Sequence, residues 1–115
     1  MTETTTMPRV DGHLRFLTSS GGVSTLSPYT LELLDSRSRH GLRRWFLVTP
    51  QEAVLVNPEN AASPDEVRAD LEDLIAVLRM QDTHVEGWID VVPNGCESIT
   101  YTVSSGSIGV QHTRC

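Results

Sequence analysis

Residues 63–80 read SPDEVRADLEDLIAVLRM, and no other part of the chain predicts a helix as clearly. Ser63 can act as the N-cap, and Pro64 would take the first helical position, where its missing N–H group is not needed. Glu66 follows Ser63 by three residues, which completes a capping box. Apolar residues recur at helical spacing along one stripe that must be buried against another element, namely Val67, Leu71, Leu74, Ile75 and Leu78.

The remaining surface of this helix carries acidic residues. Glu66, Asp70 and Asp73 form a row without a basic partner, whereas Arg68 and Glu72 can neutralise each other. Such a row is usually a solvated face. The functional alternative is a docking face for a basic partner protein.

The composition favours a single folded domain. The chain has 115 residues, of which 38% are hydrophobic, and a chain of this size can bury a core without disulfide or metal staples. Residues 1–10 are polar and threonine-rich and predict a disordered tail, followed by one α+β domain over residues 11–115. There is no run of about 18 apolar residues to span a membrane, and the N-terminus does not have the basic and apolar regions of a signal peptide. We therefore expect a cytoplasmic protein.

The charge restricts the class of partner. The net charge of −6 argues against broad binding to nucleic acids and against binding to anionic membranes. All nine basic residues are arginine, which is typical of a GC-rich bacterium or its phage. Because lysine is absent, Schiff-base catalysis and nucleophilic catalysis by lysine are excluded.

Basic residues gather in one short segment that contains Arg37, Arg39, Arg43 and Arg44. A solvated loop is the simplest interpretation of this segment. Because arginine presents a planar fork of donors, the functional alternative is a clamp that binds a phosphate or a carboxylate. The same segment could meet the acidic helix row of a second copy, which would produce a homodimer.

Alternating patterns predict a mostly antiparallel sheet of about six or seven strands, with the helix packed on one face. We expect strands before the helix at residues 13–18, 23–26, 29–34, 42–48 and 53–56. The last two are apolar on both faces, which is typical of central strands. Thr49-Pro50-Gln51-Glu52 predicts the turn between them.

The C-terminal third predicts a meander of three strands, with the first two at residues 84–92 and 97–103. A three-residue loop would connect these two strands and would pair Ile89 with Ile99. A turn at Ser105-Gly106 would form the next hairpin and pair Tyr101 with Val110.

This register leaves a polar face with Trp88 at its centre, and His84, Glu86 and Asp90 share that face. Another element, such as the N-terminal strand, could cover Trp88. Alternatively Trp88 anchors a protein interface, because tryptophan is enriched at binding hot spots. In a third interpretation His84, Glu86 and Asp90 serve a ligand or catalytic site.

Motifs that carry catalysis are missing, and no residue can be named as catalytic. The chain has no P-loop, no dinucleotide-binding glycine motif and no nucleophile elbow. His84 and Glu86 match one half of the zinc deaminase motif, but the other half, which should open a helix, falls in a predicted hairpin turn. We expect no metal and no cofactor. Cys96 and Cys115 are expected to be free thiols, and a bridge between them is the alternative.

Together these features favour a small acidic protein without catalytic activity that binds a protein partner. It would be an inhibitor, an immunity or anti-defence protein, or an accessory subunit of bacterial or phage origin. The candidate partner-binding residues are Trp88, Glu86 and Asp90 on the sheet and Glu66, Asp70 and Asp73 on the helix. Two alternatives stay open: a small-ligand-binding domain or small enzyme with a pocket between sheet and helix, and a structural homo-oligomer.

Overall fold

The computed structural model describes residues 9–37, 46–55, 63–93 and 96–114. Its elements in chain order are β1 (Arg9–Thr18), α1 (Pro28–Arg37), β2 (Phe46–Val48), β3 (Glu52–Leu55), α2 (Pro64–Met80), β4 (Thr83–Val92), β5 (Ser98–Ser104) and β6 (Ser107–Thr113). The fold is α+β, as expected, but it has two helices where the sequence predicted one. Neither of these helices is long and apolar enough to cross a membrane.

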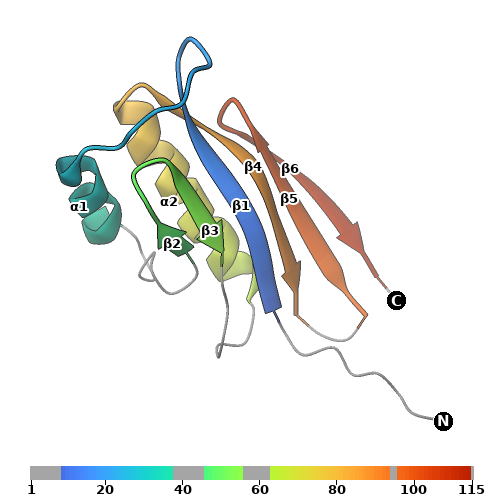
Figure 1. Ribbon diagram of the computed structural model, residues 1–115. Coiled ribbons are helices and arrows are strands. Elements are labelled where there is room, and N and C mark those ends of the chain that lie inside the picture. The colour runs from blue at the N-terminus through green and yellow to red at the C-terminus, as the bar shows by residue number, and fades with distance from the viewer. Residues whose placement is uncertain (1–8, 38–45, 56–62, 94–95, 115) are drawn as a thin grey trace.

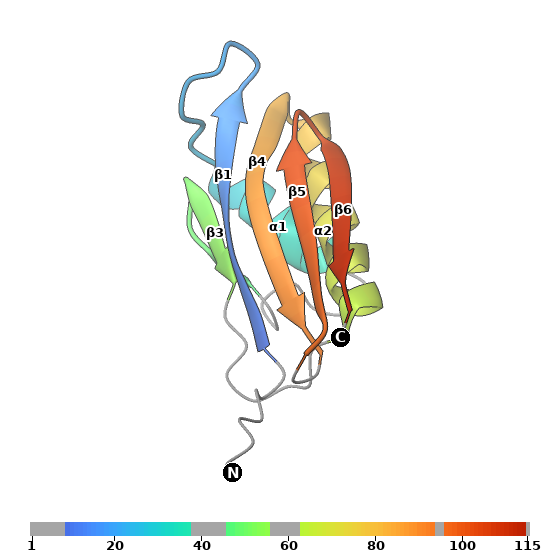
Figure 2. The same cartoon turned by 90° about the vertical axis from the view of Figure 1, so that its right-hand side faces the viewer.

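All the strands join one antiparallel sheet in the order β2-β3-β1-β4-β5-β6 (Figure 1). The first four strands and the two helices follow the split β-α-β arrangement, and β5 and β6 extend the sheet beyond β4. Both helices lie on one face of the sheet, which we call the covered face, and the opposite face, the open face, is turned towards the viewer in Figure 2.

Helix α2 begins where the sequence predicts. The Ser63 side chain accepts a hydrogen bond from the Glu66 N–H group at 3.5 Å, and Pro64 is the first helical residue. The predicted apolar stripe is buried against the covered face. It packs there with residues of the central strands, including Leu14, Phe16, Val85 and Ile89.

Helix α1 corrects the prediction of a strand at residues 29–34. The Ser27 hydroxyl accepts a hydrogen bond from the Thr30 N–H group at 3.2 Å, and Pro28 takes the first helical position. This is the same Ser-Pro start that opens α2. Thr30 and Leu34, one helical turn apart, are both buried. The short alternation of leucines in this segment resembled a strand, but the capping residues determine a helix.

The strands before α2 also differ from the prediction. β1 begins at Arg9, so Arg9 and Val10 belong to the sheet rather than to a tail. Residues 23–26 form no strand. Val23 makes an isolated bridge with Leu17, and the Ser24 N–H group donates to the Phe16 carbonyl at 2.9 Å. Residues 1–8 lie outside the described residues.

β2 and β3 lie at one edge of the sheet, not at its centre as predicted. The turn between them is confirmed, because the Thr49 N–H group donates to the Glu52 carbonyl at 2.8 Å. The centre belongs to β1 and β4, which are ten residues each and pair along their full length. Leu47 of β2 is 61% exposed. The apolar residues on both faces of this segment therefore did not mean that both faces are covered by other elements. Residues 42–45 and 56, which were predicted to extend these strands, lie outside the described residues.

The meander β4-β5-β6 is confirmed, with one change of register. Ile89 pairs with Tyr101, and Ile99 pairs with Val91, so the β4–β5 connection is two residues longer than predicted. A shift of two residues keeps every side chain on its face, because strands repeat with a period of two. The pairing of Tyr101 with Val110 is confirmed.

Cys96 is disulfide-bonded, which corrects the expectation of a free thiol. The register of the last hairpin explains why a bond is possible. Ser98, two residues after Cys96, pairs with Thr113, two residues before the only other cysteine of the chain, Cys115. Cys115 itself lies outside the described residues.

Candidate functional site

A row of residues in register crosses the open face over all six strands. From β2 to β6 the row consists of Leu47, Val54, His13, Trp88, Thr102 and Gly109. Trp88 is 46% exposed. Beyond Trp88 the row continues with Thr102 and then with Gly109, which are both small residues. The open face therefore has an accessible aromatic residue at its centre.

Alternation along β1 and β4 produces this arrangement. Val10, Leu14 and Phe16 point to the covered face and are buried, so Arg9, Asp11, His13 and Arg15 point the other way. The same period places Trp88 on the open face beside His13, whereas its chain neighbour Ile89 points to the covered face and is buried.

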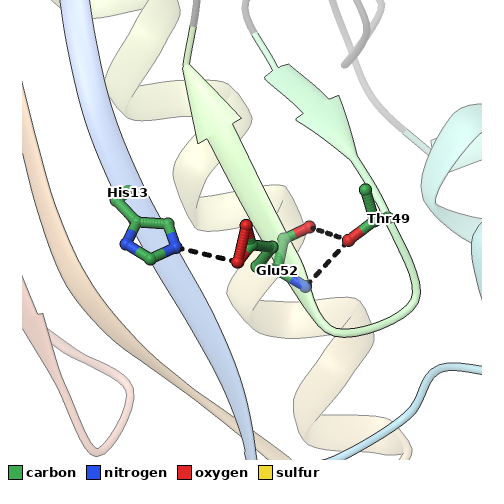
Figure 3. A network of polar contacts seen from close by, with 3 residues as sticks. All are labelled: His13, Thr49 and Glu52. Carbon is green, nitrogen blue, oxygen red and sulfur yellow. Dashed lines mark hydrogen bonds and ion pairs between the residues drawn. The ribbon is translucent and has the colours of Figure 1, made fainter.

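A polar network holds His13 in place beside Trp88 (Figure 3). Nε2 of His13 lies 3.1 Å from Oε2 of Glu52, and both side chains are half-exposed. The Thr49 hydroxyl accepts from the Glu52 N–H group and donates to the Glu52 carbonyl, both at 3.2 Å. Thr49 thus fixes the backbone of Glu52, and Glu52 orients the imidazole ring.

Charged and polar residues surround the row on both sides. Nε of Arg9 lies 2.9 Å from Oδ2 of Asp11, and the Thr100 hydroxyl donates to Oδ1 of Asp90 at 3.2 Å. Arg15 lies in register between Glu52 of β3 and Glu86 of β4, so opposite charges alternate across the sheet. The open face combines an accessible aromatic residue at its centre with a polar rim.

The structure brings together four of the predicted residues. They share the open face, as the alternation of β4 requires, and are His84, Glu86, Trp88 and Asp90. β1 lies beside β4 within the sheet, so it does not cover Trp88. Among the described residues no element lies over this face (Figure 2).

A small cavity of about 180 Å³ lies at one end of the open face, lined by His84, Glu86 and the β1 end around Leu17. It does not lie between sheet and helix, where the ligand-binding alternative placed a pocket. Cavities that enclose drug-sized ligands usually exceed about 300 Å³, so this cavity is too small for one. A separate open groove of about 330 Å³ does lie between a helix and the sheet, at α2 and β6. Within the described ranges no group of three or more His, Cys, Asp or Glu side chains could hold a metal ion.

The acidic row of α2 is not the solvated face that the sequence predicted. Asp70 is fully buried, so the prediction that it is available to a partner is wrong. Val77, two turns further along the same side, is buried as well, and α1 packs against α2. Glu66 and Asp73 are partly buried.

The arginine-rich segment remains a prediction. Arg37 is the last residue of α1. Arg39, Arg43 and Arg44 lie outside the described residues, so the anion clamp is not tested.

Sequence reasoning missed His13 and Glu52. His13 was assigned to a strand and Glu52 to a turn, but the order of the strands was not predicted. It is the position of β1 between β3 and β4 that brings both residues next to Trp88. The available signal was the full alternation of residues 9–18, which was recognised only from residue 13 onwards.

Comparison of the chain with protein-family models, with curated proteins and with solved structures gives no significant match.

Proposed function

We propose that this protein is a small binding module without catalytic activity whose working surface is the open face, and that it binds a protein partner through Trp88. The observation that supports this is the half-exposed Trp88 at the centre of a row in register, surrounded by a polar rim. Protein interfaces commonly place an aromatic anchor at the centre and polar residues around it.

A folding requirement does not account for Trp88. A tryptophan that is 46% exposed contributes less to stability than a buried one, and the strand alternation would accept a polar residue at this position. The polar neighbours of Trp88 on this face form hydrogen bonds and ion pairs with each other. Such an arrangement is typical of a rim that excludes water around an interface anchor, and less so of a catalytic site.

Within this proposal the protein is an inhibitor, an immunity or anti-defence protein, or an accessory subunit, of bacterial or phage origin and located in the cytoplasm. The disulfide at Cys96 opposes the cytoplasmic location, because protein disulfides persist mainly outside the reducing cytosol. The origin is supported only by the exclusive use of arginine.

The test is affinity capture from the native host with three forms of the tagged protein: wild type, Trp88→Ala and Tyr29→Ala. Tyr29 is an exposed aromatic residue on α1, away from the open face, and serves as the matched control. We expect the same partner with wild type and Tyr29→Ala.

The purified partner should then bind Trp88→Ala at least about 30-fold more weakly than wild type, which corresponds to a hot-spot residue. Tyr29→Ala should bind like wild type. A partner that binds all three forms equally would contradict the assignment of the open face.

A further inference from the structure

The two edges of the sheet are unlike each other. Figure 1 shows β2 at one edge and β6 at the other. β2 has three described residues, whereas β6 has seven. Proteins usually protect long edge strands with charged residues, proline or bulges. Yet residues 98–113, which span β5, β6 and their turn, contain no Asp, Glu, Lys, Arg or Pro. The outer edge of β6 therefore presents unprotected backbone N–H and C=O groups, and no described segment pairs with it.

A groove of about 330 Å³ lies between α2 and β6, next to this edge. Ile75, Ala76 and Ile108 give it apolar walls, and its charged lining consists of Arg68, Glu72 and Arg79, which leaves one net positive charge. Val110, one alternation beyond Ile108 on the same face of β6, is 50% exposed. A strand added to β6 would direct every second side chain towards this groove and towards Val110.

The two arginines differ in what they contact. Nε of Arg68 lies 3.8 Å from Oε2 of Glu72, and its guanidinium lies 6.0 Å from the centre of the Tyr101 ring. Arg79 donates one hydrogen bond, to the Gly106 carbonyl at 3.4 Å, and takes part in no ion pair among the described residues. Its remaining N–H groups can bind a carboxylate that enters the groove.

The position of α2 argues against a second copy as the occupant. Residues of α2 and β6 line the same groove, so α2 stands over this edge of the sheet. Antiparallel pairing of two β6 strands would place the α2 helices of both copies over the same two strands, where packed helix axes need about 8–10 Å of separation. A single extended segment without a helix layer meets no such obstacle.

We propose that the β6 edge binds an extended segment of a partner protein by strand addition, with an apolar side chain in the groove and a carboxylate at Arg79. This mode takes its affinity from main-chain hydrogen bonds and its specificity from the alternating side chains. The surface is independent of the open face, so the protein can hold two partner segments, or two parts of one partner.

Blocked seven-residue peptides provide the probe, with threonine alternating with two valines and one glutamate. A matched peptide carries lysine instead of glutamate. Two further peptides are N-methylated on alternate amides, in the two possible phases. We expect the acidic peptide to shift the backbone amide resonances of β6 in nitrogen–proton spectra of the intact protein. The lysine peptide should bind at least about threefold more weakly, and one of the two methylated peptides should not bind.

Variants assign the effect to the groove. Arg79→Gln should abolish the preference for glutamate over lysine, whereas Arg15→Gln, at an exposed arginine of the open face, should preserve it. Trp88→Ala should bind the peptide like wild type, which separates this surface from the proposed function. No shift of β6 resonances, equal binding of the acidic and lysine peptides, or an unchanged preference in Arg79→Gln would each overturn the proposal.

Discussion

The two faces of the sheet are built from the same strands but differ in what determines their residues. On the covered face Leu14, Phe16 and Ile89 are fully buried, and the packing of α2 accounts for each of them. On the open face their chain neighbours His13 and Trp88 stay accessible, and no packing requirement selects them. The covered face therefore explains why the chain folds, and the open face is where a function separate from folding can be sought.

The largest difference between the faces should appear on truncation of an aromatic residue. Phe16→Ala should lower the free energy of unfolding by about 3–5 kcal/mol, because it leaves a cavity in the core. Trp88→Ala should change it by about 1 kcal/mol or less. Urea denaturation monitored by circular dichroism measures both. Equal losses would show that Trp88 is structural, and would remove the contrast on which the proposed function rests.

A smaller difference is expected between two glycines of the sheet. Gly87 has a φ of 150°, and an added Cβ would lie 2.0 Å from the His13 carbonyl oxygen. Gly87→Ala should therefore destabilise the fold by about 1–3 kcal/mol through backbone strain. Gly109→Ala, on the open face, meets no atom closer than 3.8 Å and should be nearly neutral. Thermal unfolding of the two variants provides the comparison, and similar melting temperatures would contradict the strained pairing of β1 and β4.

The smallest effect concerns Tyr101, whose ring lies on the covered face. Burial raises the pKa of the Tyr101 hydroxyl, Asp65 and Glu72 raise it further, and Arg68 opposes them. The pKa of this hydroxyl is therefore higher in the folded protein than in the unfolded chain. The contribution of Tyr101 to stability is complete below about pH 10 and is lost as the pH rises through the pKa of the folded state.

Tyr101→Phe should lower stability by about 1 kcal/mol at neutral pH, since the hydroxyl donates to the Pro64 carbonyl at 3.3 Å. Above about pH 10 the variant should lose less stability than wild type. Chemical denaturation at a series of alkaline pH values tests this, with His13→Gln as an open-face control. Parallel curves for wild type and Tyr101→Phe would show that another group governs the alkaline loss.

Local signals predicted the parts of the fold that depend on neighbouring residues. The cap at Ser63, the turn at Thr49–Glu52 and the β5–β6 hairpin are all specified within a few positions, and all are confirmed. The same reasoning at Ser27 and Pro28 would have identified α1, had the cap been weighed above the leucine alternation. The β4–β5 register was wrong by two residues, because a period of two cannot distinguish such shifts.

The candidate site was predictable only in part, for a physical reason. Trp88, Glu86 and Asp90 are on one strand, so alternation alone places them on one face. His13 and Glu52 join them through pairing of strands that are distant in the sequence, which no local pattern encodes. Asp70 shows the opposite failure, because a charged residue on a helix predicts exposure, whereas packing against that side of α2 buries it.

The central place of the first strand has a consequence for the synthesis of the chain. Arg9 pairs with Val92, and Thr18 pairs with Thr83, so the β1 edge that faces β4 stays unpaired until residues 83–92 have left the ribosome. Its partner on the other side, β3, is only four residues long and can hold it weakly in the meantime. Contacts between such distant segments slow folding, and nascent chains with unpaired strand edges are prone to associate. The nascent chain thus exposes Leu14 and Phe16 until β4 has been synthesised, and a chaperone that shields β1 would raise the yield of folded protein.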